Sequence, residues 1–211
     1  MDLSLDAPEV RVLGSLLEKE ITTPEYYPLS LNALVNACNQ KSNRDPAVHY
    51  DDATVEDTLD RLREKGLLTT VTGAGSRVPK FGHRISEKLN LGRRELAILC
   101  ELMLRGPQTL GELRGRTERL HKFDDTTEVE TVIDQHMTAL VVKLPRRPGE
   151  KESRYAHLLS GEPAAAAEES AHEAASPRQD RIAVLESEIA VLRADVESLK
   201  QQFAEFRKQF D

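Results

Sequence analysis

The residues of this sequence that could do chemistry are arginines and lysines grouped in short segments between the apolar runs. One group lies at 39–44, and others lie at 77–80, 114–116 and 146–154. Guanidinium and ammonium groups in such segments are the side chains that most often contact nucleic-acid phosphates. The candidate DNA-binding residues are therefore Lys41, Arg44, Arg77, Lys80, Arg114, Arg116, Arg146, Arg147, Lys151 and Arg154.

Catalytic and cofactor chemistry have no comparable signal. The chain holds no GxxxxGK[ST] loop, HExxH, CxxC or GxSxG motif. His83 and His157 occupy equivalent positions of a repeat, which favours a shared packing or hydrogen-bonding role over a metal site. Cys38 and Cys100 lie among apolar helix residues and are predicted to be buried. We therefore expect no enzyme activity, no catalytic residue, no metal and no cofactor.

The balance of charge limits where a nucleic acid could bind. The 29 Lys and Arg residues face 36 Asp and Glu residues, for a net charge of −7. Residues 91–160 carry 12 basic and 11 acidic residues, whereas 161–211 carry 6 and 11. A protein whose whole surface attracts nucleic acid is excluded, so a basic patch must be local.

The elements that must position these groups occur twice. Phe81-Gly82-His83 is echoed by Tyr155-Ala156-His157 at a shift of 74, and the first helices match at a shift of 86. The two copies cover about 5–88, here called repeat one, and 91–160, here called repeat two. Each is predicted to hold three helices followed by a β-hairpin, which is the order of a winged helix-turn-helix.

Capping residues mark the expected helix ends in both repeats. Asp6 and Ser30 are predicted to begin the first and second helices of repeat one. A Thr54/Asp57 pair resembles a capping box for the third helix, which should end at Gly66. In repeat two we expect helices at 93–105, 109–117 and 127–139, the last begun by a Thr127/Glu130 box, and strands at 140–144 and 154–159.

Both third helices have an acidic composition. In repeat one, Glu56, Asp57, Asp60 and Glu64 oppose Arg61, Arg63 and Lys65. In repeat two the third helix has Glu128, Glu130 and Asp134 and no Lys or Arg. An acidic helix is repelled by phosphates, so the usual winged-helix contact is expected to shift to the hairpins and to the Lys41/Arg44 loop.

The C-terminal part has a different pattern. Residues 161–178 are rich in Ala, Glu and Pro and form a predicted linker, either flexible or partly helical. Residues 179–211 form the predicted coiled-coil helix. Within it, 181–210 carry a heptad repeat with opposite charges at facing g and e positions, which favours a parallel homodimer. Three late Phe residues admit a trimer or another partner, and the alternative is a helix packed on its own chain. The predicted dimer seam is Ile182, Leu185, Ile189, Leu192, Val196, Leu199, Phe203, Phe206 and Phe210.

Three segments of the sequence resemble a known family. The run from Leu31 to Pro46, LNALVNACNQKSNRDP, together with Leu104-Arg105-Gly106-Pro107-Gln108-Thr109 and Arg154-Tyr155-Ala156-His157-Leu158-Leu159, is similar to the YceH-like family of uncharacterised bacterial proteins. The resemblance covers about residues 5–160. It implies two winged-helix domains and a C-terminal helical tail, and it assigns no activity to any residue.

These observations predict a mainly α protein with small β-hairpins, an α+β class. Its expected parts are winged-helix domains at 1–90 and 91–160, the linker and the coiled-coil helix. With no long apolar run and no secretory signal, we expect a cytoplasmic protein without a membrane partner. The favoured function is a DNA-binding, transcription-regulator-like homodimer that binds double-stranded DNA. The alternative is a protein–protein docking module of a chromosome-associated or transcription assembly, without direct DNA readout.

Overall fold

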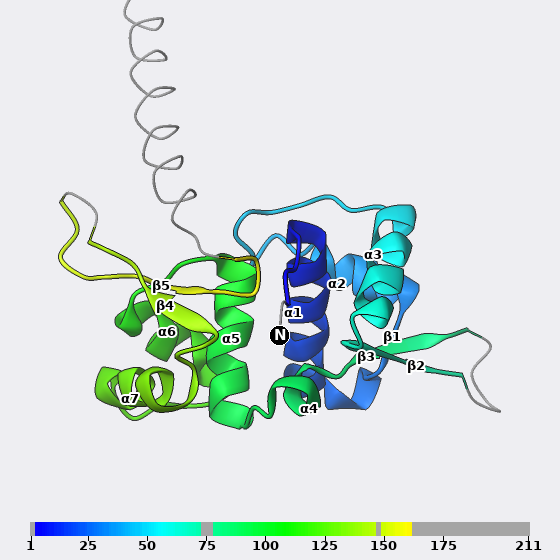
Figure 1. The fold of residues 1–211 in the computed structure, drawn as a ribbon. Helices are drawn as coiled ribbons and strands as arrows, with labels where there is room; N and C mark the ends of the chain where they lie inside the picture. The colour runs from blue at the N-terminus through cyan, green and yellow to red at the C-terminus, as the bar shows by residue number, and fades with distance from the viewer. Residues whose placement is uncertain (1–2, 73–77, 147–148, 162–211) are drawn as a thin grey trace, which may run out of the picture. The chain divides into compact units, whose positions relative to one another are not determined.

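A computed structural model describes residues 3–72, 78–146 and 149–161 (Figure 1). Met1–Glu162 form one compact unit of helices and small antiparallel sheets. The predicted seam and nearly all of the predicted linker lie outside the described residues, as do Arg77 and Arg147. Within the described ranges, no helix is both long enough and apolar enough to cross a membrane.

Repeat one combines three main helices with a three-stranded sheet. β3 is the central strand, and it pairs antiparallel with β1 on one side and with β2 on the other. The elements are α1 (Ala7–Thr22), the 3-10 turn η1 (Pro24–Tyr26), β1 (Leu29–Ser30), α2 (Leu31–Cys38), α3 (Asp52–Glu64), β2 (Leu68–Val71) and β3 (Lys80–His83).

Repeat two follows the short helix α4 (Ile85–Leu89) and has the same order of helices and hairpin. β4 and β5 pair antiparallel, and Gln108 bridges to Tyr155 on the far side of β5. The elements are α5 (Arg93–Arg105), α6 (Leu110–Arg116), the 3-10 turn η2 (Thr117–Arg119), α7 (Thr126–His136), β4 (Val141–Lys143) and β5 (Tyr155–His157).

Several predicted element ends are confirmed. Asp6 begins α1 with a complete capping box, in which Asp6 and Glu9 each accept a backbone N–H of the other. The hydroxyl of Ser30 accepts the N–H of Ala33 at the start of α2. The third helix of repeat one ends before Gly66, whose φ of +68° lies in the left-handed region. Cys38 and Cys100 are fully buried, as predicted.

Other expectations are wrong in detail. The cap of α3 is Asp51, which accepts the N–H of Thr54, so Thr54 lies inside the helix. The cap of α7 is likewise Asp125 rather than Thr127. In both cases an Asp three residues before its donor competes successfully with the nearby Thr. β1 and α4 were not predicted, because each is too short to show periodicity.

The two repeats share one hydrophobic core across the α1–α5 contact (Figure 1). Gly14 of α1 and Cys100 of α5 are equivalent residues of the repeat, and they meet there: the Cys100 thiol donates to the Gly14 carbonyl at 3.7 Å. A Cβ added at Gly14 would lie 3.2 Å from the Cβ of Met103 and 3.0 Å from Leu104 Cδ2. The missing side chain of Gly14 therefore sets how closely these helices approach.

We predict that Gly14→Ala lowers the free energy of unfolding by about 1 kcal/mol. Alanine favours a helix over glycine by about 1 kcal/mol, but overpacking a tight core contact costs about 1–3 kcal/mol. Gly115→Ala in α6 is the matched control, because a Cβ there meets nothing within 4 Å. It should raise the free energy of unfolding by about 0.5–1 kcal/mol. Urea denaturation measures both, and a stabilising Gly14→Ala would contradict the tight contact.

Candidate functional site

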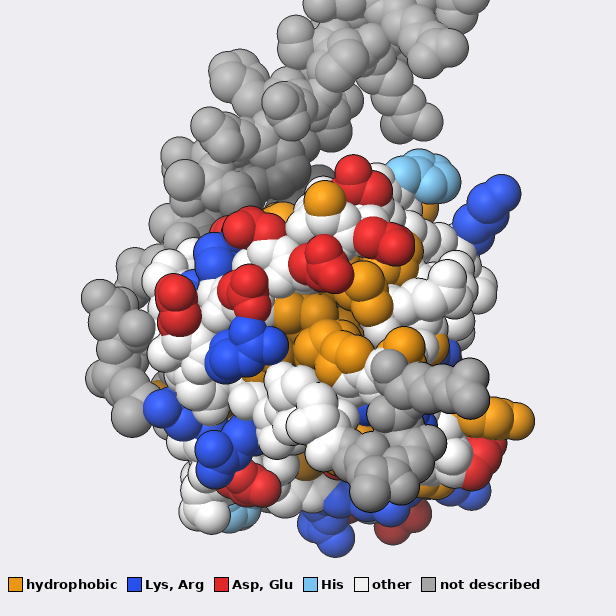
Figure 2. Space-filling view, turned by 90° about the vertical axis from the view of Figure 1, so that its right-hand side faces the viewer, with side chains coloured by type: hydrophobic (Ala, Val, Ile, Leu, Met, Phe, Trp, Pro, Cys, Tyr) orange, Lys and Arg blue, Asp and Glu red, His pale blue; other side chains and the backbone are white. Residues whose placement is uncertain are grey.

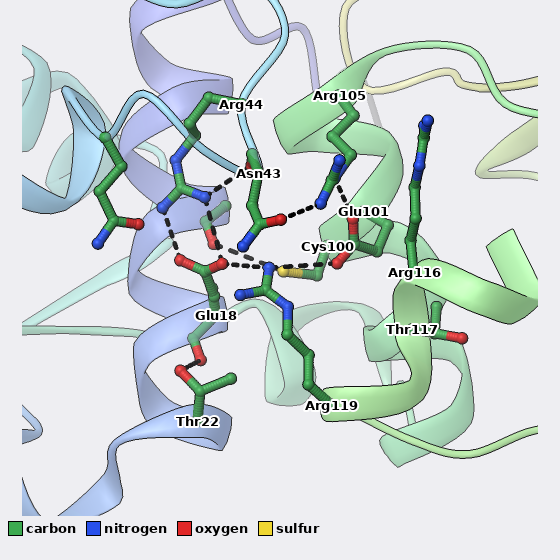
Figure 3. Close-up of polar contacts among 12 residues, drawn as sticks. Glu18, Thr22, Asn43, Arg44, Cys100, Glu101, Arg105, Arg116, Thr117 and Arg119 are labelled. Carbon is green, nitrogen blue, oxygen red and sulfur yellow. Dashed lines mark hydrogen bonds and ion pairs between the residues drawn. The ribbon is translucent and has the colours of Figure 1, made fainter. Parts of the chain in front are cut away.

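The Lys41/Arg44 loop has a different role from the one predicted for it. The guanidinium of Arg44 is fully buried and grips the Glu18 carboxylate with two nitrogens, at 3.2 and 2.6 Å (Figure 3). It also donates to the carbonyls of Ala37 and Asn43. The prediction that Arg44 contacts DNA is therefore wrong, because its buried guanidinium already binds a carboxylate and is not available to a phosphate. Lys41 stays exposed on the same loop.

This loop also ties repeat one to repeat two. The Asp45 N–H donates to the Leu104 carbonyl near the end of α5, at 2.9 Å. Asn43, with a φ of +59°, accepts a hydrogen bond from Arg105. Arg11 is buried in α1 and donates to the Pro46 carbonyl at 2.6 Å. The loop thus supplies partners for helix-end carbonyls that would otherwise be buried without one.

Two buried carboxylates, one from each repeat, meet on a single arginine. Glu18 of α1 and Glu101 of α5 both have fully buried side chains, and Arg119 forms ion pairs with both (Figure 3). Arg105 adds an ion pair to Glu101 at 2.8 Å. We call Glu18, Arg44, Glu101, Arg105 and Arg119 the interface ion cluster. Buried charges require such pairing because desolvation of an unpaired charge costs several kcal/mol.

The two carboxylates of the cluster differ in acidity. Burial opposes ionisation of Glu18, but the hydrogen bonds and charge of Arg44, with Arg119, outweigh it and lower the pKa to about 2. Burial raises the pKa of Glu101, which shares Arg119 and lies near the negative charge of Glu18. Glu18 is therefore the carboxylate whose ionised form stabilises the fold.

The repeated histidines do not share one role. His83 is buried with Nε2 at 2.8 Å from Glu20 Oε2, and its backbone N–H donates to the Tyr27 hydroxyl. His157 has no such carboxylate partner among its described contacts, and burial lowers its pKa to about 4. The His83 ring thus makes a carboxylate contact that His157 lacks among the described residues, but neither ring nitrogen of His83 has a hydrogen-bond partner there, so the predicted hydrogen-bonding role is not found for either ring. Among the described residues, no group of His, Cys, Asp and Glu is placed to hold a metal ion.

The structure brings together only some of the basic candidates. Arg146 and Lys151 are exposed and line one hollow of about 230 Å³ between the β4–β5 hairpin and the first turns of α6 and α7. Lys143 lines the same hollow, and sequence reasoning missed it because a single Lys in a strand carries no spacing signal. The hollow, here called the wing hollow, is lined by Leu110, Gly111, Thr126, Lys143, Arg146, Lys151, Glu152, Ser153 and Tyr155.

Lys143 is positioned inside the wing hollow by neighbouring side chains. Its ammonium lies 3.1 Å from Glu130 Oε1 and 5.4 Å from the centre of the Tyr155 ring. The Tyr155 hydroxyl donates to the same Glu130 oxygen at 2.9 Å. Hydrogen bonds with Tyr155 and Glu130 raise the pKa of Lys143, so this residue is charged at neutral pH.

Other candidates are occupied by internal contacts. Arg154 and Arg116 both pair with Glu112, at 2.9 and 3.2 Å. The Nε of Arg114 donates to the Asp124 carbonyl at 3.1 Å. Lys80 is half-buried in β3, at the other end of the molecule from the wing hollow (Figure 1). These arginines hold α6 against its surroundings, so Arg146 and Lys151 are the freer of the predicted basic candidates that the structure describes in repeat two.

We predict that Glu18→Gln lowers the free energy of unfolding at pH 7 by about 3 kcal/mol, because it leaves Arg44 buried without a negative partner. The difference from the native chain should shrink as pH falls from about 4.5 toward 2. The pKa of Glu18 is lower in the folded state than in the unfolded state, so its ionised form stabilises the fold above the unfolded-state pKa. This stabilisation is lost as the pH falls from about 4.5 toward 2. Urea denaturation at pH 7, 4.5 and 3 measures the difference, and a constant difference would contradict the pairing. Glu56→Gln, on the exposed face of α3, is the control and should change stability by less than about 0.5 kcal/mol.

Comparison with known proteins places the chain in a family. Residues 5–150 match the family model described as a protein of unknown function, DUF480. The chain is 55% identical to a UPF0502 protein of Solibacter usitatus, 58% identical to one of Geotalea daltonii and 52% identical to one of Geobacter sulfurreducens. Each of these matches covers the whole of both chains. The chain therefore belongs to the DUF480, or UPF0502, family of bacterial proteins of unknown function, in agreement with its resemblance to the YceH-like family.

Proposed function

We propose that this protein binds duplex DNA through repeat two, as a tandem winged-helix protein. The observation that carries the proposal is the wing hollow, where Lys143, Arg146 and Lys151 lie together beside the first turns of α6 and α7. In a winged helix these are the parts that lie nearest the DNA backbone, with the third helix toward the major groove. Arg146, Lys151 and the Glu130-paired Lys143 outnumber Glu152, the acidic residue of the same lining, so the hollow matches a phosphate better than a neutral ligand.

The mode of contact follows from the charges. The residues exposed on α7 include Thr127, Thr131, Asp134, Gln135 and His136, and none of them is Lys or Arg. Affinity must therefore come from phosphate contacts at the hairpin, which position a protein without reading the sequence. The exposed uncharged side chains of α7 would add only weak discrimination between bases. We infer a binder with modest sequence preference.

Repeat one does not suit DNA. Its third helix, α3, exposes Asp52, Glu56, Asp57, Asp60 and Glu64, while the exposed Arg63 pairs with Asp60. Phosphates would be repelled by this face. This observation favours the second candidate function, protein docking, for repeat one alone. The two repeats would then divide the work, one toward DNA and one toward protein.

Self-association is the second part of the proposal. The heptad of residues 181–210 supports a parallel homodimer, which would present two wing hollows related by a two-fold axis. Two linked sites raise the effective concentration of the second contact once the first has formed. A dimer would therefore bind DNA more tightly than a single chain with the same surface.

We predict that Arg146→Ala/Lys151→Ala weakens binding of a labelled duplex by about tenfold at about 50 mM salt, across all sequences. The plot of log affinity against log salt concentration should become shallower, with its negative slope reduced in magnitude by about 2 for each chain bound. Fluorescence anisotropy measures both. Arg84→Ala/Lys88→Ala removes two exposed charges from repeat one and is the control, expected to leave binding unchanged. No binding at about 50 mM salt, or equal losses in the two variants, would overturn the DNA proposal.

We predict that light scattering at micromolar concentration gives twice the 23.6 kDa mass of one chain. Leu192→Asp/Leu199→Asp places charges in the seam and should reduce the mass to one chain, because a buried unpaired carboxylate is costly. Ser187→Asp/Gln201→Asp adds the same charge at f positions, outside the seam, and should leave the dimer intact. A single-chain mass for the native protein would refute the dimer.

A further inference from the structure

We propose that repeat one captures an extended, basic segment of a partner protein, which adds as a strand to the outer edge of β2. The inference does not depend on DNA binding by repeat two. It rests on three features of the described residues: an open strand edge, exposed apolar side chains next to it, and the acidic outer face of α3.

The edge is open because β2 lies at one end of its sheet. The strand order is β1-β3-β2, so β2 pairs with β3 on one side and with no described strand on the other. The Arg84 N–H donates to the Leu67 carbonyl, which places Leu67 in a hydrogen-bonded pair. In an antiparallel ladder such pairs alternate, so Thr70 directs its N–H and C=O away from β3. These groups are what an added strand would bind.

The equivalent edge strand of repeat two differs from β2 in a way that disfavours strand addition. Its edge strand, β4, has three residues and ends in Lys143, and a charged residue on a short strand is a common safeguard against unwanted pairing. β2 is longer and reads Leu68-Thr69-Thr70-Val71, with no charge. Thr69, Thr70 and Val71 are all exposed. Repeat one therefore keeps an edge that repeat two blocks.

The surroundings of β2 define the chemistry of the segment. Two of the large exposed apolar residues of the described chain lie at this hairpin: Val71 ends β2, and Val78 lies two residues before β3. Figure 2 shows hydrophobic side chains gathered at the centre of the face that carries α3 and the β2–β3 hairpin, with Asp and Glu side chains along the upper border and Lys and Arg side chains to the left and below. Arg63 of α3 donates to the Thr70 hydroxyl at 3.3 Å and pairs with Asp60, so α3 lies beside the edge and the acidic residues of its outer face lie beyond this arginine.

Charge complementarity selects a basic occupant. The exposed carboxylates of Glu56 and Glu64 form no ion pair among the described residues, and both lie on α3. A segment that alternates Lys or Arg with β-branched residues would satisfy the edge, the apolar side chains and these carboxylates together. The tail of the chain itself is a poor occupant, because residues 161–211 carry 11 acidic and 6 basic residues. Duplex DNA is excluded by the same acidic face.

The test is selection of peptides from a random dodecapeptide library on the full chain, followed by binding of the synthetic winners. We expect the winners to be rich in Lys or Arg alternating with Val, Ile or Thr. Bound peptide should slow hydrogen exchange of the Thr70 amide, because that N–H gains an acceptor. Thr70→Pro removes the N–H at a position where an edge strand tolerates proline, and should weaken binding at least about tenfold.

Two further variants separate strand addition from misfolding and from simple charge attraction. Thr70→Lys keeps the N–H but places a like charge at the edge, as Lys143 does on β4, and should also weaken binding. Thr138→Lys adds the same charge to an exposed turn of repeat two and should leave binding unchanged. Glu56→Gln/Glu64→Gln should weaken binding by about threefold to tenfold and flatten its salt dependence.

The proposal is overturned if the library yields no binding peptide, or if the winners are acidic. It is also overturned if the winners bind while Thr70 exchange stays unchanged, or if Thr138→Lys weakens them as much as Thr70→Lys. Loss of binding in Thr70→Pro counts only with a native thermal melt. Where that variant is unfolded, Thr70→Lys and the exchange rate of the native chain decide.

Discussion

The structure depends on one electrostatic constraint: a carboxylate from each repeat is buried where α1 packs on α5. Glu18 and Glu101 have no access to water, so each must be paired within the protein. Arg119 reaches both of them from η2, while Arg44 and Arg105 complete the pairing from either side. Separating the repeats would expose hydrophobic core and break the Glu18–Arg119 ion pair, which joins repeat one to repeat two within this cluster. The interface ion cluster therefore specifies one arrangement of the two repeats.

That arrangement gives the molecule two different ends. α3 and the β2–β3 hairpin lie on the side of α1, whereas α7 and the β4–β5 hairpin lie on the side of α5 (Figure 1). Both ends are built from the same order of elements, but their exposed residues differ. In our proposals, the cations of the wing hollow bind a nucleic acid, and the uncharged edge of β2 beside the acidic α3 binds a protein segment. A homodimer would present each surface twice.

The sequence predicted those features that depend on residues close together in the chain, such as helix caps. Asp6 and Ser30 were identified as caps because side-chain acceptors at helix starts follow a short-range pattern, and the 93–105 helix was found from the internal repeat and from Gly106-Pro107 at its end. The choice between Asp51 and Thr54 was missed, because both residue types cap well and only backbone geometry decides between them.

Long-range chemistry was harder to predict. In the sequence, Arg44 has the pattern of a surface cation in a polar loop. Its partner Glu18 lies 26 positions earlier in the chain, and only the folded structure brings the two together. Lys143 acquires its place in the wing hollow from Glu130 and Tyr155, which come from a different helix and strand. The open edge of β2 was equally invisible, since strand order is not encoded by periodicity. Contacts between distant segments decide which charges are free to bind.

The most direct test of the account is pulsed thiol labelling through a urea titration, resolved for each cysteine by mass spectrometry. Cys38 of α2 reports on repeat one, and Cys100 of α5 reports on the interface; both are free and fully buried. If the ion cluster and shared core join the repeats into one cooperative unit, both thiols become reactive at the same urea concentration. If Cys100 is labelled at clearly lower urea than Cys38, the repeats separate before they unfold and the central claim is wrong.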